Sequence, residues 1–171
     1  MQMVKKIFIV LGLGWFAILL FMPKQELYYK LEQELAQKSI KINEKEIDTG
    51  LFSLTLHQAD IYVKGIKIAT AKSVEFFTVL FYSSIRIDDL VLDDSLKAMA
   101  PTQIDETLIS YKVWDPMDVA IEAKGPFGSL DGKVNIGNKN MRIDFDENSS
   151  IENLKPKLQQ DNKGWYYEKS F

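Results

Sequence analysis

Acidic pairs and the single histidine are the side chains of this chain best suited to catalysis. The carboxylate pairs are Asp88-Asp89 and Asp93-Asp94, and paired carboxylates are typical of acid and base catalysis. Neighbours on a strand point to opposite faces, so neither pair converges on one substrate atom. His57 alternates with leucines 54 and 56, which directs its ring to water and leaves no multi-histidine site. The sequence predicts a non-enzyme with no catalytic residue, cofactor or metal.

Two glycine-containing segments are superficially similar to nucleotide-binding loops. Gly12 and Gly14 lie inside an apolar run, whereas the dinucleotide motif needs a strand before it and a helix after it. Residues 125–132 are not followed by the lysine and hydroxyl of a phosphate-binding loop. We interpret the first segment as small packing residues in a helix and the second as a bent hairpin or bulge.

Asn148 belongs to the pattern Asp146-x-Asn148-x-Ser150. Asn-x-Ser is a glycosylation acceptor, and the acidic residue two positions earlier resembles the longer form used by bacterial oligosaccharyltransferases. Modification of Asn148 is a hypothesis that the intact mass of the native protein tests.

Residues 7–22 form an uncharged apolar run, and this run predicts a transmembrane anchor. Sixteen residues fall short of the roughly twenty that cross a hydrocarbon core, but Met3 and Val4 extend the run if Lys5 and Lys6 reach the headgroups. The anchor is represented by Ile7, Val10, Leu13, Trp15, Ile18, Leu20 and Met22.

The flanks of this run predict its orientation. Lys5 and Lys6 favour a cytoplasmic N-terminus, which places the remaining chain in the periplasm of a bacterial inner membrane as a single-pass protein. A cleaved signal peptide is the alternative. No pair of small residues suited to the peptidase follows Phe21, so an uncleaved anchor is favoured.

The composition is that of one exported domain beyond the anchor. The chain has 171 residues and no cysteine, which excludes disulfides, zinc thiolates and thiol catalysis. Its net charge of −3 argues against nucleic acid as a partner, since phosphate binding needs clustered lysine and arginine. We divide the chain into 1–23, the anchor; 24–38, an amphipathic helix; and 39–171, a periplasmic antiparallel β-domain.

Leu27, Leu31 and Leu35 recur every fourth residue in the predicted helix 24–38. The stripe has two interpretations: it covers part of the following sheet, which is favoured, or it binds a partner helix or a membrane surface. From residue 39 the apolar period becomes two, which is typical of half-buried antiparallel strands. An apolar face or groove is expected from Phe52, Leu54, Leu56, Ile61 and Val63.

The alternation fails in residues 74–82, where either a fully buried strand or a short helix is possible, and the helix is favoured. A loop is expected over 93–105, with one helical turn at residues 96–99. Later strands are predicted at 108–114, 119–123, 134–136, 141–145 and 165–168. A short helix carrying Ile151, Leu154 and Leu158 precedes the last strand, and Phe171 is expected to be docked.

This layout resembles the membrane-proximal part of the AsmA-like proteins. The similarity covers the anchor ending in Phe21-Met22-Pro23, the helix Leu27 to Ala36, and the strand Ile85 to Leu92. The type II secretion system protein N family is similar there and in the glycine-spaced hairpin 125–132. The bitopic component of the lipopolysaccharide transport bridge resembles this chain in size, anchor and sheet type.

The resemblance implies a mainly β protein with a bent antiparallel meander and a concave apolar face. It implies a non-enzymatic role in type II secretion or envelope assembly, with membrane and envelope proteins as partners. A lipid-holding or lipid-transport module is the alternative, and an unrecognised carboxylate enzyme is the third hypothesis. An open apolar face favours lipid, and a packed face favours a scaffold.

Overall fold

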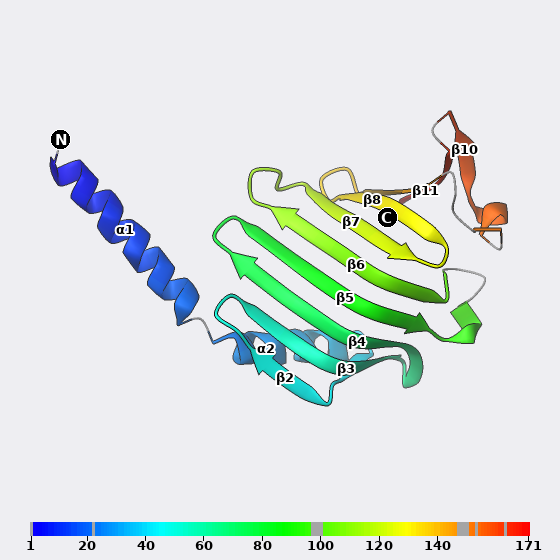
Figure 1. The fold of residues 1–171 in the computed structure, drawn as a ribbon, viewed down its shortest axis with the longest axis horizontal. Helices are drawn as coiled ribbons and strands as arrows, with labels where there is room; N and C mark the ends of the chain where they lie inside the picture. Colours follow the sequence, from blue (N-terminus) through cyan, green and yellow to red (C-terminus); the bar gives the residue numbers. More distant parts are fainter. Residues whose placement is uncertain (1, 22, 97–100, 147–150, 153, 163) are drawn as a thin grey trace.

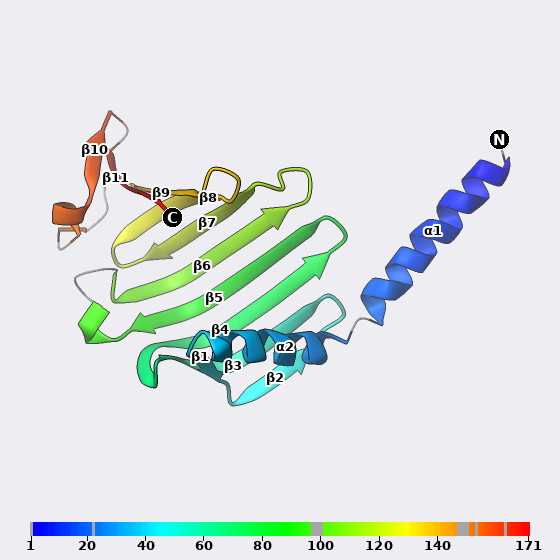
Figure 2. The ribbon, with the colours of Figure 1, turned by 180° about the vertical axis from the view of Figure 1, so that it is seen from behind.

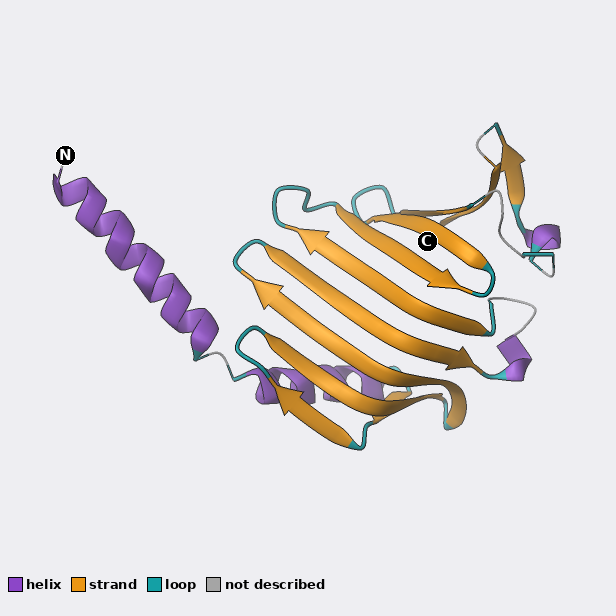
Figure 3. Ribbon diagram, viewed as in Figure 1, coloured by secondary structure: helices purple, strands orange, loops and turns teal. Residues whose placement is uncertain are grey.

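The computed structural model describes residues 2–21, 23–96, 101–146, 151–152, 154–162 and 164–171. Within these ranges the protein is mainly β, with two α-helices and one open antiparallel sheet of eleven strands (Figure 1, Figure 3). The predicted fold class is therefore confirmed at this level.

Two helices precede the sheet. Helix α1 (Gln2–Leu20) projects away from the sheet, and α2 (Lys24–Gln37) lies against it (Figure 1). In the described part of the chain, no helix combines the length and the apolar character needed to cross a membrane. The bounds of α2 agree with the predicted helix 24–38, and α2 contacts β1 and β3. The side chain that it buries against the sheet is Tyr28, whereas Leu27 and Leu31 of the predicted stripe stay partly exposed.

The strands follow one another as a meander in which nearly every strand pairs with its neighbour in sequence. The order is β1-β3-β4-β5-β6-β7-β8-β9-β11-β10, and β2 shares the outer edge of β3 with β1. The strands are β1 (Ile40–Asn43), β2 (Glu46–Thr49), β3 (Ser53–Val63), β4 (Ile66–Val79), β5 (Tyr82–Leu92), β6 (Gln103–Lys112), β7 (Asp118–Gly125), β8 (Gly128–Asn135), β9 (Asn140–Phe145), β10 (Gln159–Asp161) and β11 (Gly164–Ser170).

The meander gives the sheet two distinct ends. The turns 50–52, 80–81, 113–117 and 136–139 lie at the end where α1 joins, which we call the α1 end. The opposite turns, including 64–65 and 126–127, lie at the far end. Helix α2 runs from the α1 end to the far end, because it begins beside α1 and leads into β1, whose Ile40 pairs with Val63.

One face of the sheet carries both cores. Beneath α2, Tyr28 packs with Leu54, Leu56, Ala59 and residues of β4. On the same face, near the opposite border of the sheet, Ile151 and Leu154 cover Phe145 on β9. Leu56 is fully buried, with 0% of its surface exposed, and it anchors the first core.

Gln58 on β3, Lys72 on β4 and Asp89 on β5 form a row across the sheet toward its far end. At this row the side chains that point to the apolar face change from one set of alternate positions to the other, while the strands stay paired in the same register. On β3 the buried residues change from Leu54 and Leu56 to Ala59, and Gln58 between them has φ +52°. On β5 Asp89 has φ +48° and forms an ion pair with Lys72 of β4 at 3.2 Å. Positive φ is uncommon for non-glycine residues. The row therefore marks a built-in irregularity in the ladder, at which the strands exchange inward and outward positions.

The expected short helix in residues 74–82 is wrong, because β4 continues as a strand to Val79. The apolar run arises because Phe77 lies on the otherwise polar face, where its ring centroid is 6.4 Å from that of Tyr82. Residues 80–81 then form the turn to β5.

The remaining expectations are met in part. The helical turn expected at residues 96–99 lies almost entirely outside the described residues. The described part of the loop contains the 3₁₀ turn Asp94–Leu96, and β6 already begins at Gln103. The predicted helix around Ile151 contains only the 3₁₀ turn Lys155–Lys157 in the described residues. The last strand is confirmed as β11. The ring of Phe171 is exposed, so only its backbone, bonded to Lys139, is docked.

Candidate functional site

The most extensive feature of the sheet is an apolar face left open between its two covered borders. Figure 2 shows α2 across one border and the segment before β10 at the other, with β5 to β8 visible between them. Two rows of paired residues cross these central strands: Ile85, Ile109, Ile121, Gly132 and Ile143, and Ile87, Thr107, Ala123, Leu130 and Phe145.

The central members of the first row are half-buried rather than covered, whereas Thr107 and Ala123 of the second row are buried. Ile85, Ile109 and Ile121 each retain part of their surface to solvent, although alternation points them away from the polar face. Gly132 interrupts the first row, because a Cβ there would lie 3.2 Å from the Cβ of Ile121. Packed faces of antiparallel sheets normally bury such residues against a second layer. The open face therefore offers an apolar surface to a ligand or partner.

A pocket of about 180 Å³ lies under the first turns of α2, at the α1 end of this face. Its lining is almost entirely apolar, with one cation, Lys24, among the residues around it. The lining residues are Lys24, Leu27, Tyr28, Leu31, Phe52, Leu54, Phe76 and Thr78. A small apolar pocket with one lysine at its lining suits part of an aliphatic chain attached to an anionic or polar group.

Tyr28 fixes the helix over this pocket. The side chain is only 5% exposed, its ring centroid lies 6.4 Å from that of Phe76, and its hydroxyl donates a hydrogen bond to Glu44 at 2.9 Å. Burial, and secondly the bond to the Glu44 carboxylate, raise the pKa of Tyr28 well above its ordinary value. The tyrosine therefore stays neutral and joins α2 to the loop after β1.

Thr107 is the buried polar residue in the floor of the open face. Its hydroxyl oxygen is enclosed and has no hydrogen-bond partner in the described part of the chain. A buried hydroxyl without a hydrogen-bond partner lowers the stability of the folded state, so Thr107 is not explained by stability.

The opposite face is polar and its charges are paired. Lys133 contacts Asp118, and Lys67 contacts Asp60 at 2.7 Å. The lysine ammonium in each pair, acting mainly through its hydrogen bond, lowers the pKa of the aspartate. Arg142 binds both Asp144 and Asp161 at 2.6 Å, and these bonds raise its pKa. A pocket of about 290 Å³ on this face is lined mainly by polar and charged side chains, among them Lys112, Asp118 and Lys133, in contrast to the apolar pocket under α2.

No protein-family model, curated protein or solved structure matches this chain.

The structure brings some of the predicted groove residues together and separates others. Phe52 and Leu54 line the pocket. Leu56 is buried in the core beneath α2 and lies outside the pocket lining. Ile61 and Val63 pair with β1 nearer the far end and do not line the pocket.

Sequence reasoning did not identify the other side of the pocket or the central floor of the face. Lys24, Leu27 and Leu31 come from α2, and Phe76 comes from the segment predicted to be helical. The four-residue leucine spacing was the available signal for α2. The contribution of Ile109 and Ile121 depends on strand order, which alternation alone does not give.

The predicted anchor residues lie on α1, and their described side chains face outward. The five that can be described are all exposed: Ile7, Val10, Leu13, Trp15 and Ile18. Met22, the side chain of Leu20 and the acceptor Asn148 lie outside the described residues. His57 is on the polar face, 3.0 Å from Asp48, as the alternation predicted.

Proposed function

We propose that the protein is a non-enzymatic, membrane-anchored lipid-holding module. The observation that carries this proposal is the apolar pocket under α2. The half-buried row Ile85, Ile109 and Ile121 lies on the same face of the sheet. An acyl chain in the pocket would place its polar end near Lys24, the cation of the lining.

The anchoring part of the proposal rests on the surface of α1. Every large apolar side chain described from Met3 to Phe16, and Ile18 after it, is exposed, all around the helix. A helix that is apolar on all sides is expected in an apolar environment. Its nineteen residues measure about 28 Å, which falls short of the roughly 30 Å of a hydrocarbon core, and no described helix meets the length and apolar character of a membrane span. The anchoring role of α1 therefore rests on the exposure of its apolar side chains.

The orientation and compartment follow from the flanks of α1. With Lys5 and Lys6 on the cytoplasmic side, the sheet lies at the periplasmic surface of a bacterial inner membrane. A C-terminal alkaline phosphatase fusion tests this arrangement. Activity is expected, and an inactive fusion that is stably produced would contradict the orientation.

Native mass spectrometry of the full chain extracted in mild detergent tests lipid holding. We expect bound phospholipid on the wild-type protein. Thr78→Trp places a bulky ring at the pocket lining from an exposed position and should reduce the lipid-bound fraction. Glu122→Trp is the matched control, since Glu122 is an exposed strand residue on the polar face.

Lipid that adheres only to α1 would be retained equally by both variants. Equal occupancy in Thr78→Trp and Glu122→Trp therefore contradicts lipid holding in the pocket, as does a wild-type protein with no bound lipid. Loss in Thr78→Trp alone supports it.

An accessory role in secretion or envelope assembly, similar to that of the AsmA-like and protein N families, is the second candidate. It is favoured by the edge of β11, where β10 pairs only with residues 164–166 while β9 pairs with the strand as far as Ser170 on its other side. An exposed strand edge is suited to strand addition by a protein partner. A co-purifying protein in the same mass spectra would support this role.

A further inference from the structure

Exposed apolar side chains outside the helices are concentrated at one end of the sheet. Among the described residues after α2 there are ten large ones, and only Ile66 and Val91 lie toward the far end. The other eight lie in the turns or at the chain terminus of the α1 end: Leu51, Leu80, Phe81, Val113, Trp114, Met117, Ile136 and Phe171. We call these eight residues the rim.

The two ends differ although both consist mainly of hairpin turns. Turns favour glycine, asparagine, aspartate and proline for conformational reasons, and the far end has such residues at Lys64-Gly65 and Asp161-Asn162. At the α1 end, Trp114 is 70% exposed next to a turn that already contains Asp115 and Pro116. Turn formation does not require the rim side chains, so their exposure needs another explanation.

Backbone hydrogen bonds link neighbouring hairpin ends along the rim. The N–H of Val113 donates to the carbonyl of Phe81 at 3.0 Å, and the N–H of Ile136 donates to that of Met117 at 2.7 Å. The N–H of Phe171 donates to the carbonyl of Lys139 at 2.9 Å. Neighbouring hairpin ends are therefore held level with one another across the width of the sheet.

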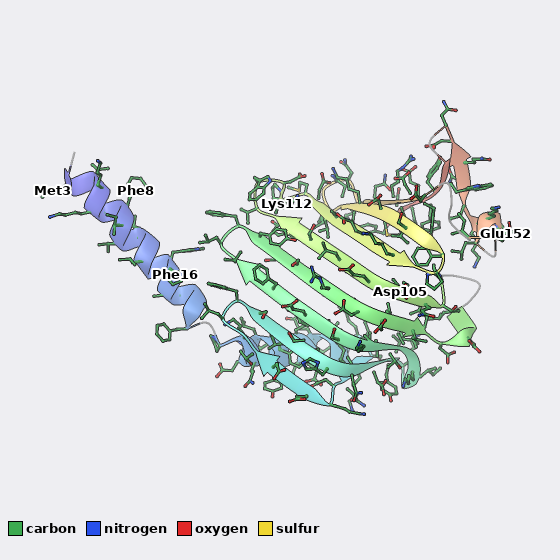
Figure 4. The ribbon with its side chains drawn as sticks, viewed as in Figure 1. Met3, Phe8, Phe16, Asp105, Lys112 and Glu152 are labelled. Carbon is green, nitrogen blue, oxygen red and sulfur yellow. The ribbon has the colours of Figure 1, made fainter. Side chains whose placement is uncertain are left out.

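The row lies beside the last turns of α1. The rings of Phe16 and Phe52 are in edge contact, with centroids 6.0 Å apart. Gly12, Trp15 and Phe16 line a shallow hollow together with Leu80 and Phe81 of the rim. Figure 4 labels Phe16 on α1 and Lys112 next to the rim, while Asp105, at the other end of the same strand, lies away from α1.

A bilayer fits this arrangement better than a protein partner does. The rim is a line of separated apolar points rather than one compact patch, whereas protein interfaces have a contiguous apolar core. The line is level with the end of an apolar helix, and tryptophan is enriched where a membrane meets water. Lysines at 112 and 139 flank the row and suit a headgroup region.

We propose that the rim inserts into the interfacial layer of the bilayer that holds α1. This inference rests on the proposed insertion of α1. The rim would then fix the sheet upright on the membrane, with the mouth of the pocket under α2 at the level of the lipid.

Three single-tryptophan forms of the full chain, reconstituted into phosphatidylcholine vesicles with brominated acyl chains, test the rim. The first keeps only Trp15 and the second only Trp114, with the other tryptophans changed to phenylalanine. The third carries Ile66→Trp as its only tryptophan. Ile66 is 67% exposed beside a hairpin turn at the far end and is the matched control.

We expect brominated lipid to quench Trp15 and Trp114 and to leave the tryptophan at position 66 bright. Quenching of Trp15 without quenching of Trp114 overturns the rim while the insertion of α1 stands. Absence of quenching at both positions overturns the insertion of α1 and the rim together. Equal quenching at positions 114 and 66 overturns the upright placement on which the rim depends.

Amide hydrogen exchange of the wild-type chain provides a second measurement that needs no substitution. The backbone amides of residues 113–117 should exchange more slowly when the chain is in phosphatidylcholine vesicles than when it is kept in solution without a bilayer or micelles. The exchange rates of residues 64–65 should be the same in both conditions. Equal exchange of residues 113–117 in both conditions overturns the rim.

Discussion

The two faces of the sheet use the same strands but satisfy their side chains in different ways. On the polar face, charges find partners within the sheet, as Lys133 does with Asp118 and Arg142 with Asp144. On the apolar face, packing is complete only beneath α2 and around Ile151. The central residues, such as Ile109, are left half-buried. The side chains of the polar face find partners within the sheet, whereas the half-buried residues of the apolar face leave a surface that a ligand can contact.

The largest expected effect comes from removing packing at the covered border of the apolar face. Leu56→Ala should lower the free energy of unfolding by about 2–5 kcal/mol, because a fully buried leucine leaves a cavity. Urea unfolding of the full chain in detergent, followed by circular dichroism of the sheet, measures this loss. A loss below about 1 kcal/mol would mean that α2 does not close a real core.

The next effect compares the two faces at adjacent residues of β6. Ile109→Glu puts a charge in the open apolar face and should strongly reduce the lipid-bound fraction in native mass spectra. Leu108→Glu is the control, because Leu108 lies on the polar face between Arg86 and Glu122. Equal lipid occupancy in the two variants would show that the open face does not bind lipid.

A smaller effect is expected at the buried hydroxyl of Thr107. Thr107→Val keeps the shape of the side chain and removes an oxygen that has no partner in the described structure. We expect a gain in stability of up to about 1 kcal/mol in urea unfolding. Destabilisation of that size would instead indicate that the hydroxyl is bonded in solution.

The smallest effect concerns an ion pair of the polar face. Lys133 lowers the pKa of Asp118 below its ordinary value of 3.8, so the contribution of this carboxylate to stability is present above that value. It is lost as the pH falls through the lowered pKa. Asp118→Asn should therefore be slightly less stable than wild type at pH 6, and the difference should vanish at sufficiently acidic pH. Urea unfolding at a series of pH values measures it; a difference that grows on acidification contradicts the assignment.

The sequence predicted the elements whose pattern is local. The leucine spacing located α2 to within one residue of its observed end, and alternation identified Leu54 and Leu56 as inward-facing. Beyond Gln58 the alternation shifts because this residue adopts φ +52°, which glutamine does not signal as glycine would. Phe77 made a strand resemble a helix, since its partner Tyr82 lies across a turn.

The pocket and the rim required the strand order. Lys24 and Thr78 are far apart in sequence and line one pocket only because α2 lies across β3 and β4. Phe81 and Trp114 lie in turns that are distant in sequence. Pairing of β5 with β6 brings these turns together, so that the N–H of Val113 donates to the carbonyl of Phe81. Single-sequence periodicity carries no information on either arrangement.

The meander also constrains how such a chain can grow or shrink. Because each hairpin returns the chain to the end from which it started, duplicating or deleting a whole hairpin changes the breadth of the molecule by two strands. It leaves every remaining turn on its original side. Gene rearrangement in units of roughly 20–30 residues, the length of one hairpin, would therefore produce broader or narrower homologues with the same polarity relative to the N-terminal helix.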